Sequence, residues 1–222
     1  MRGHVMINII AAGDIHSPRY LQLFIKSMNN INIKPDLILL AGDLVEANHV
    51  HALKPVYDYL TSKYSDIPII SVFGNEEYKG FEYRYIEQYS RFKWLNDEYV
   101  VININNVKVG VIGTRGALTK PTNWQLRNIP GIVEYYRELP YRIGGMIDEL
   151  RDSVDVIILL SHYGVTYRNL EGELKTIWQH LASQLFEKVI IEKKPDLVIH
   201  AHVHLGIHEV VYLDGVPVYN VS

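Results

Sequence analysis

Short apolar runs without alternating polar residues recur along the chain, and they limit its fold more than any other sequence feature. Every side chain from Leu37 to Ala41 is apolar, and so is every side chain from Val156 to Leu160. Strands of this kind are buried on both faces, as in parallel sheets that helices cover. Helical spacing of apolar residues follows the early runs, in residues 18–28 and 49–64. The sequence therefore predicts an α/β fold, which we expect to form one domain over residues 1–222.

Two hairpin patterns add antiparallel strands to this fold. Residues 99–113 turn at Asn105-Asn106 and residues 208–221 turn at Asp214-Gly215, and such dipeptides favour tight hairpins. Parallel and antiparallel strands in a chain of 222 residues fit best into two packed sheets with helices outside. Further helices are predicted over residues 78–92, 132–151, where Pro140 and Gly144-Gly145 interrupt the pattern, and 173–193, the most regular of the three.

Composition excludes several classes of protein. The chain has no cysteine, so disulfides, thiolate zinc sites and cysteine nucleophiles are ruled out. Its net charge of −3 argues against constitutive binding to nucleic acid, because proteins that bind a phosphate backbone are usually basic. No run approaches the roughly 18 apolar residues of a membrane-spanning helix, and residues 1–7 show no leader-peptide cleavage site. We therefore expect a cytoplasmic protein without membrane contact, and the sequence leaves its oligomeric state open.

Ligand-type side chains stand at the carboxyl ends of five predicted strands. These side chains are Asp14, His16, Asp43, Asn75, His162, His202 and His204. A single Asp after a strand is more often a helix cap, and the His-rich run alone would fit exposed histidines at a strand end equally well. Capping does not explain the whole set, because the carboxyl ends of parallel strands share one edge of a sheet, where ligands bind.

The chemistry of this set indicates two metal ions. Carboxylate, imidazole and amide donors without sulfur suit Mn²⁺, Fe or Zn²⁺, and seven donors exceed the needs of one tetrahedral ion. Two ions that share a bridging carboxylate would use them all, and such pairs catalyse in-line displacement at phosphorus. The residues therefore predict hydrolysis of phosphoesters or related bonds.

The motifs that carry these residues resemble those of the calcineurin-like metallophosphoesterase family. In order, they are Gly13-Asp14-Ile15-His16, Gly42-Asp43, Gly74-Asn75, Ser161-His162 and Ala201-His202-Val203-His204. The resemblance implies an αββα sandwich of two mixed sheets with flanking helices. It also implies two divalent ions (Mn, Fe, Zn or Ni), one bound by Asp14, His16 and His204 and the other by Asn75, His162 and His202, with Asp43 as the bridge. A hydroxide between the ions would attack a phosphate-ester substrate.

The chain departs from the family pattern next to Asn75. The family has a histidine where this chain has Glu76, and that histidine stabilises the transition state or protonates the leaving group. An ionised Glu76 would repel a phosphate, whereas a protonated one could act as an acid. Alternatively, Glu76 is only a first-turn residue of a helix. Glu77 stands where the family has an acidic residue, and we expect it to orient a ligand histidine.

A second departure is Ala201, which replaces the usual glycine before His202. It raises the question of whether His200 and His202 form the ligand pair instead. The motif favours His202 and His204, so we interpret His200 as a buried, hydrogen-bonded residue below the site.

Substrate contacts are the least constrained part of the sequence. No inserted recognition domain is visible, and the loop over residues 114–130 is the best candidate for contact. Arg115 in this loop could bind a phosphate, although a solvated loop with incidental charge is an equal alternative. Tyr163 could line the site or simply pack. The remaining histidines (His4, His49, His51, His180 and His208) have no motif support, and we interpret them as surface or core residues.

We therefore expect a phosphoesterase acting on diesters or on monoesters with good leaving groups, with Asp43, Asn75 and Glu76 as catalytic residues. The alternatives are an inactive binding or scaffold protein on the same fold, and a nuclease of the same family. The full ligand set argues against a scaffold, while the net charge and the missing histidine argue against a nuclease.

Overall fold

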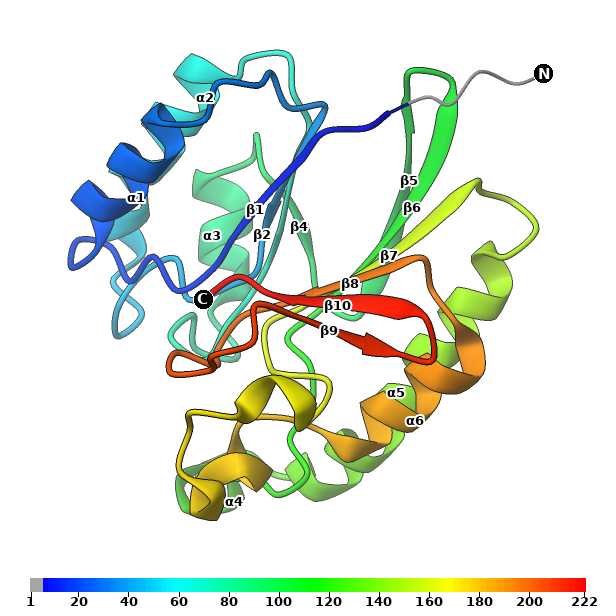
Figure 1. Cartoon of the computed structure of the whole chain (residues 1–222). Helices are drawn as coiled ribbons and strands as arrows, with labels where there is room; N and C mark the ends of the chain where they lie inside the picture. The colour runs from blue at the N-terminus through cyan, green and yellow to red at the C-terminus, as the bar shows by residue number, and fades with distance from the viewer. Residues whose placement is uncertain (1–5) are drawn as a thin grey trace.

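The computed structural model describes residues 6–222. Residues 1–5, which include His4 and most of the stretch discussed above for a leader peptide, lie outside the described residues. Its first sheet has four parallel strands in the order β1-β2-β3-β4 (Figure 1). They are β1 (Ile9–Ala12), β2 (Leu37–Leu40), β3 (Ile69–Val72) and β4 (Lys93–Leu95). The first three match the predicted apolar runs.

The second sheet has six strands in the order β5-β6-β7-β8-β10-β9. They are β5 (Glu98–Ile104), β6 (Val107–Thr114), β7 (Val156–Ser161), β8 (Leu197–His200), β9 (Val210–Leu213) and β10 (Val216–Asn220). Both predicted hairpins are confirmed, because β5 pairs antiparallel with β6 and β9 pairs antiparallel with β10. The strands between them run parallel, so the sheet is mixed.

Helices cover the outer face of each sheet (Figure 1). The helices over the first sheet are α1 (Leu21–Asn29), α2 (Lys54–Lys63) and α3 (Glu82–Gln88), and those over the second are α5 (Ile132–Leu150) and α6 (Gln184–Lys193). The short α4 (Asn123–Asn128) lies beyond the strand ends, and single 3₁₀ turns occur at Val50–Leu53, Arg168–Leu170 and Lys175–His180. The predicted αββα sandwich is confirmed.

The central strands contribute to two cores at once. In β2, Leu37 and Leu39 face the second sheet, while Ile38 and Leu40 pack under the helices. All four side chains are buried, because successive side chains point to opposite faces of a strand and both faces are covered. The continuous apolar run is thus explained, and the sandwich holds the strand ends in fixed positions.

The elements differ from the sequence expectations in several places, and one of them is α4, which lies within the expected loop of residues 114–130. Residues 173–183 are not α-helical, and α6 begins only at Gln184, where the Ser183 side chain caps the helix. Pro140 lies inside α5 without interrupting it. Strand β4 was not expected, because three residues at the edge of the sheet carry too little pattern to be recognised.

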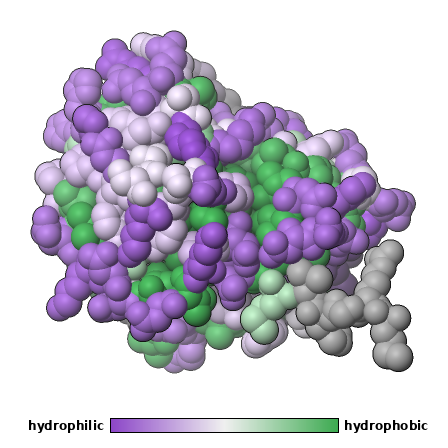
Figure 2. Space-filling view, turned by 90° about the horizontal axis from the view of Figure 1, so that it is seen from above, coloured by the Kyte–Doolittle hydropathy of each residue, from purple (hydrophilic) through white to green (hydrophobic). Residues whose placement is uncertain are grey.

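The end of the sandwich that holds the β5–β6 turn has a mainly hydrophilic surface. Figure 2 shows this end from above, with apolar side chains only in separate patches. Among the described residues, no helix is both long and apolar enough to cross a membrane.

Candidate metal centre

All seven predicted ligand residues lie in loops that follow the carboxyl ends of strands. These strands are β1, β2 and β3 of the first sheet and β7 and β8 of the second. The structure gathers six of the side chains into two groups, whose ligand atoms lie within 4.8 Å of one another inside each group. The groups are Asp14 with His16 and His204, and Asp43 with His162 and His202.

The first group surrounds one oxygen of Asp14. Its Oδ1 lies 3.3 Å from His204 Nε2 and 3.7 Å from His16 Nε2. This oxygen is buried and accepts no hydrogen bond from any described residue. Because a buried carboxylate oxygen without a partner is costly, its surroundings fit a cation between Asp14 and the two imidazoles.

In the second group, ring nitrogen and oxygen atoms that carry lone pairs lie close to one another. His162 donates a hydrogen bond from Nδ1 to the Ala41 carbonyl at 2.9 Å, so Nε2 of the neutral ring carries no proton. That Nε2 lies 3.1 Å from Asn75 Oδ1 and 3.5 Å from Asp43 Oδ2. Three electron-pair donors without a proton between them repel one another unless they share a cation. The donor set therefore fits a divalent ion, and Asn75 joins this group.

Asp43 lies between the two groups. Its Oδ2, at 3.5 Å from His162 Nε2, is also 3.9 Å from His16 Nε2. Its Oδ1 accepts a hydrogen bond from the Glu76 amide at 2.8 Å, which fixes the carboxylate. The position suits one carboxylate that faces both groups.

The backbone at the site adopts conformations that non-glycine residues avoid. Asp14, His16, Asp43 and His202 have φ values of 51°, 43°, 50° and 69°. Such strain is typical of functional sites, where the surrounding structure enforces it. Gly74 is required here, because a Cβ on it would overlap the carboxylate and amide of Asp43. The glycines that precede the ligands thus allow their loops to approach closely.

Burial keeps the imidazoles of His162 and His202 neutral. It lowers the pKa of His162 to about 3 and that of His202 to about 4. Burial would raise the pKa of Asp14, but the imidazoles of His204 and His162 close to it outweigh this effect, and the pKa falls. Burial raises the pKa of Asp43, and the charges of Glu77 and Asp14 raise it further. Metal ligands must be deprotonated. The neutral imidazoles of His162 and His202 meet this condition, whereas the carboxylates of Asp43, Glu77 and Asp14 repel one another.

A family model for calcineurin-like phosphoesterases matches residues 7–206 of the chain. The chain belongs to the calcineurin-like phosphoesterase family. By family it is a metal-dependent phosphoric ester hydrolase. No curated protein sequence was found to match it.

Solved structures of the same fold show low sequence identity. A proposed 5′-nucleotidase from Staphylococcus aureus, solved with α-ketoglutarate, has a TM-score of 0.62 at 15% identity over 96% of this chain. This chain spans only 48% of that protein. A phosphopantetheinyl hydrolase from Mycobacterium tuberculosis has a TM-score of 0.61 at 13% identity, covering 96% of this chain and 88% of the other. GAP50, the anchor in the inner membrane complex of Plasmodium, has a TM-score of 0.60 at 13% identity, covering 97% and 71%. At these identities the likeness concerns the fold.

Glu76, which replaces the family histidine, has both carboxylate oxygens in hydrogen bonds with neighbouring residues. Its carboxylate accepts hydrogen bonds from the Ala47 amide at 2.6 Å and from Asn75 Nδ2 at 3.2 Å. The second contact orients the Asn75 amide so that Oδ1 faces His162. The structure therefore places Glu76 beside the centre as a support of Asn75.

Glu77 has a different place from the one we expected. Its buried carboxylate forms no hydrogen bond with a histidine of the described residues and instead accepts hydrogen bonds from the amides of Asp43, Leu44, Val45 and Gly74 at 2.7–3.2 Å. It thereby ties the loop after β2 to the loop after β3. Its effect on the metal ligands acts through the backbone of Asp43.

His200 lies outside both ligand groups. It is buried, and its ring nitrogens contact the Ala201 carbonyl at 2.9 Å and Asn169 Oδ1 at 3.2 Å. These contacts hold the ring in place outside both ligand groups.

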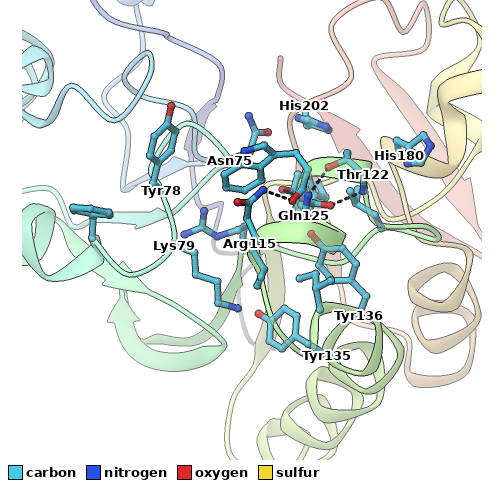
Figure 3. Close-up of a pocket in the computed structure, with 17 residues that line it drawn as sticks. Asn75, Tyr78, Lys79, Arg115, Thr122, Gln125, Tyr135, Tyr136, His180 and His202 are labelled. Carbon is cyan, nitrogen blue, oxygen red and sulfur yellow. Dashed lines mark hydrogen bonds between the residues drawn. The ribbon is translucent and has the colours of Figure 1, made fainter.

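A pocket of about 770 Å³ adjoins the centre, and Asn75 and His202 form part of its wall. Arg115 lines it as well (Figure 3), and so does Tyr163. Arg115, however, donates to the Gly74 and Glu77 carbonyls and pairs with Glu82 at 3.0 Å. These contacts occupy three of the five N–H donors of its guanidinium. The Tyr163 ring packs 4.8 Å from that of His202.

Sequence reasoning missed several pocket residues. His180, which we interpreted as a surface or core residue, lines the pocket. Lys79 and Tyr135 also line it and belong to no motif. Of the lining residues outside the ligand set, the sequence pointed to Arg115 and Tyr163.

Proposed function

We propose that the chain hydrolyses phosphodiesters, or phosphomonoesters with good leaving groups, with two divalent metal ions. The ions would be bound by Asp14, His16 and His204 and by Asn75, His162 and His202, with Asp43 between them. The observation that carries the proposal is the place of Asp43 Oδ2, which is 3.5 Å from His162 Nε2 and 3.9 Å from His16 Nε2. Manganese, iron, zinc and nickel all suit such nitrogen and oxygen donors.

When bound, the ions would supply Lewis acidity and an activated water molecule. The chain's own residues arrange the surroundings. The Glu76 amide holds Asp43, and the Glu76 carboxylate holds Asn75. The Ala41 carbonyl fixes the His162 tautomer that leaves Nε2 free. These contacts hold the donors in place before any ion or substrate binds.

The preference for good leaving groups follows from Glu76. Its two carboxylate oxygens accept hydrogen bonds from Ala47 and Asn75, so it acts as an acceptor rather than a proton donor. An alkoxide leaving group needs a proton, whereas an aryloxide leaves without one. We therefore propose that alkyl monoesters are poor substrates.

A scaffold role is the second candidate, since one structure with the same fold is GAP50, an anchor in a membrane complex. The ligand groups and the strained backbone around them support the enzyme instead, because a scaffold needs neither. A nuclease is the third candidate, and no observation on the structure favours it.

The test combines metal analysis with two substrates. The purified protein is analysed for bound metal, and hydrolysis of bis-p-nitrophenyl phosphate and p-nitrophenyl phosphate is measured with Mn²⁺. We expect bound metal, turnover of both esters and loss of turnover in EDTA. Absence of both metal binding and turnover would contradict the proposal and favour the scaffold.

A further inference from the structure

The pocket beside the metal centre has an aromatic wall that the hydrolysis of a phosphate group does not require. Tyr78, Phe81 and Trp124 line its mouth, and each is more than a third exposed. Tyr135 and Tyr136 lie at the end away from His202 (Figure 3). Aromatic side chains gathered around one cavity typically mark a ligand site. The cavity of about 770 Å³ is far larger than a phosphate group.

Positive charge is in excess at the Tyr135 end of this pocket. The charges that act most strongly on Lys79 are those of Arg115 and Arg142 and those of Asp97 and Glu82. With Lys79 itself, three cations therefore face two carboxylates. Each carboxylate already has partners. Glu82 binds Arg115 at 3.0 Å and the Gly80 amide at 2.6 Å. Asp97 accepts from Arg142 at 2.9 Å, from Tyr135 at 2.7 Å and from Thr114 at 2.6 Å.

Lys79 is therefore the cation that remains available. Its Nζ forms no salt bridge with a carboxylate of the described residues, although Arg115 and Arg142 each form one. Instead it lies 4.0 Å from the centre of the Tyr135 ring, and Figure 3 shows its side chain extending toward that ring. Partial burial, and then the charge of Arg115, lower the pKa of Lys79. A bound anion would stabilise the charged form of Lys79 and so offset both effects.

We propose that the substrate carries, on its organic part, an aromatic group with a second anionic group, and that Lys79 binds this anion. The aromatic group would lie among Tyr78, Trp124 and Tyr136 while the phosphate lies at the metal centre. The inference rests on the proposed function, which places the phosphate there. Lys79 then determines specificity and does not touch the reacting atoms.

Three phosphodiesters that share the p-nitrophenol leaving group test the proposal. Their second ester group is methyl, 4-carbamoylbenzyl or 4-carboxybenzyl. We expect kcat/KM to rise in that order, and the carboxylate to exceed the carboxamide by about tenfold, the effect of one charge-assisted hydrogen bond at a partly exposed site. In Lys79→Met this ratio should fall to about one, and Lys79→Arg should keep most of it. Lys26→Met, an exposed lysine on α1, is the matched control and should keep the full ratio.

Equal loss for carboxylate and carboxamide in Lys79→Met would overturn the proposal, because Lys79 would then act on the shared phosphate. A wild-type ratio near one would overturn it as well.

A binding measurement separates this inference from the proposed function. The non-hydrolysable 4-carboxybenzylphosphonate is titrated into metal-loaded protein, and tryptophan fluorescence is followed, since Trp124 lines the pocket. We expect Kd to be about tenfold higher in Lys79→Met than in wild type. If all three esters resist hydrolysis while this difference is found, the proposed activity fails and the anion site stands. An unchanged Kd would reject the anion site whatever the activity.

Discussion

The methyl group of Ala201 faces Gly13 across the two sheets, so closely that a Cβ on Gly13 would lie 2.5 Å from it. These residues precede His202 and Asp14, one ligand from each group. Space for the methyl group of Ala201 exists because the residue opposite has no side chain.

Gly13→Ala should therefore destabilise the protein by about 1–3 kcal/mol, the usual cost of overpacking a core. In the Ala201→Gly background the same change should cost much less, because the opposing methyl group is gone. Urea unfolding of the four proteins in EDTA measures the coupling. Gly145→Ala, where nothing lies within 4 Å, is the control and should not destabilise. Additive costs in the double variant would show that the two sites do not compete for space.

Glu77→Gln should destabilise the loops that carry Asp43 and Asn75. Each Glu77 oxygen accepts two backbone hydrogen bonds, and an amide nitrogen in place of one oxygen would leave two buried donors unpaired. We expect a loss of about 3 kcal/mol or more, together with weaker metal binding, measured by urea unfolding and by metal titration. Glu87→Gln, at an exposed position in α3, should change neither. Unaltered stability of Glu77→Gln would mean that the loops hold without the carboxylate.

The metal-free protein should lose stability as the pH falls below about 6.5, partly through His200. Burial lowers the pKa of His200 from its ordinary value of 6.5 to about 4, so between these values the unfolded chain binds a proton that the folded chain does not. Acid therefore favours unfolding, by about 1.4 kcal/mol per pH unit for one such group. Unfolding in urea with EDTA from pH 7 to pH 4.5 measures the slope. His200→Gln should reduce it and the exposed His51→Gln should not; identical slopes in both variants would contradict this origin.

Asp43→Asn should abolish turnover while leaving the fold intact. The amide oxygen can still accept the hydrogen bond from the Glu76 amide, but the negative charge between the two ligand groups is lost. We expect kcat to fall by about two orders of magnitude or more, and fewer metal ions to be retained per chain. Asp58→Asn on the surface of α2 is the control. Wild-type turnover in Asp43→Asn would refute its place between the ions.

Glu76→His should raise the hydrolysis of p-nitrophenyl phosphate relative to bis-p-nitrophenyl phosphate, because it restores a group that can donate a proton to the substrate. The contacts to Ala47 and Asn75 are lost in the exchange, so absolute rates for both esters can fall while their ratio rises. Glu76→Gln, which restores no proton donor of suitable pKa, is the matched comparison. An unchanged ratio in Glu76→His would show that the departure does not limit monoester hydrolysis.

Much of the fold could be predicted because buried strands have an unmistakable pattern. Leu37 to Ala41 can only be a strand with both faces covered, and the Asn105-Asn106 turn fixes the β5–β6 hairpin. The pattern misled us at residues 173–183. Leu174 and Ile177 have helical spacing but are 71% and 37% exposed, so no core holds them in a helix. Periodicity reports which residues could share a face and does not show that the face is buried.

The ligand residues could be proposed because strand ends and motifs mark them. The pocket could not, since its wall comes from segments that are far apart in sequence. Lys79 follows β3, Tyr135 lies in α5 and Trp124 lies in α4. Lys79 is an ordinary residue in sequence, and only its spare charge distinguishes it. Glu77 stood out by its place in the motif, but the four backbone amides around its carboxylate could not be predicted.

The Asp14 carboxylate accepts a hydrogen bond from the His202 amide, 188 positions further along the chain, at 2.8 Å. Each ligand group likewise combines residues from early and late in the sequence. Closing such a separation costs chain entropy before any contact forms, so an ion cannot nucleate folding at this centre. Metal uptake should be a late event that follows the docking of the two sheets, and its rate should report when that docking is complete.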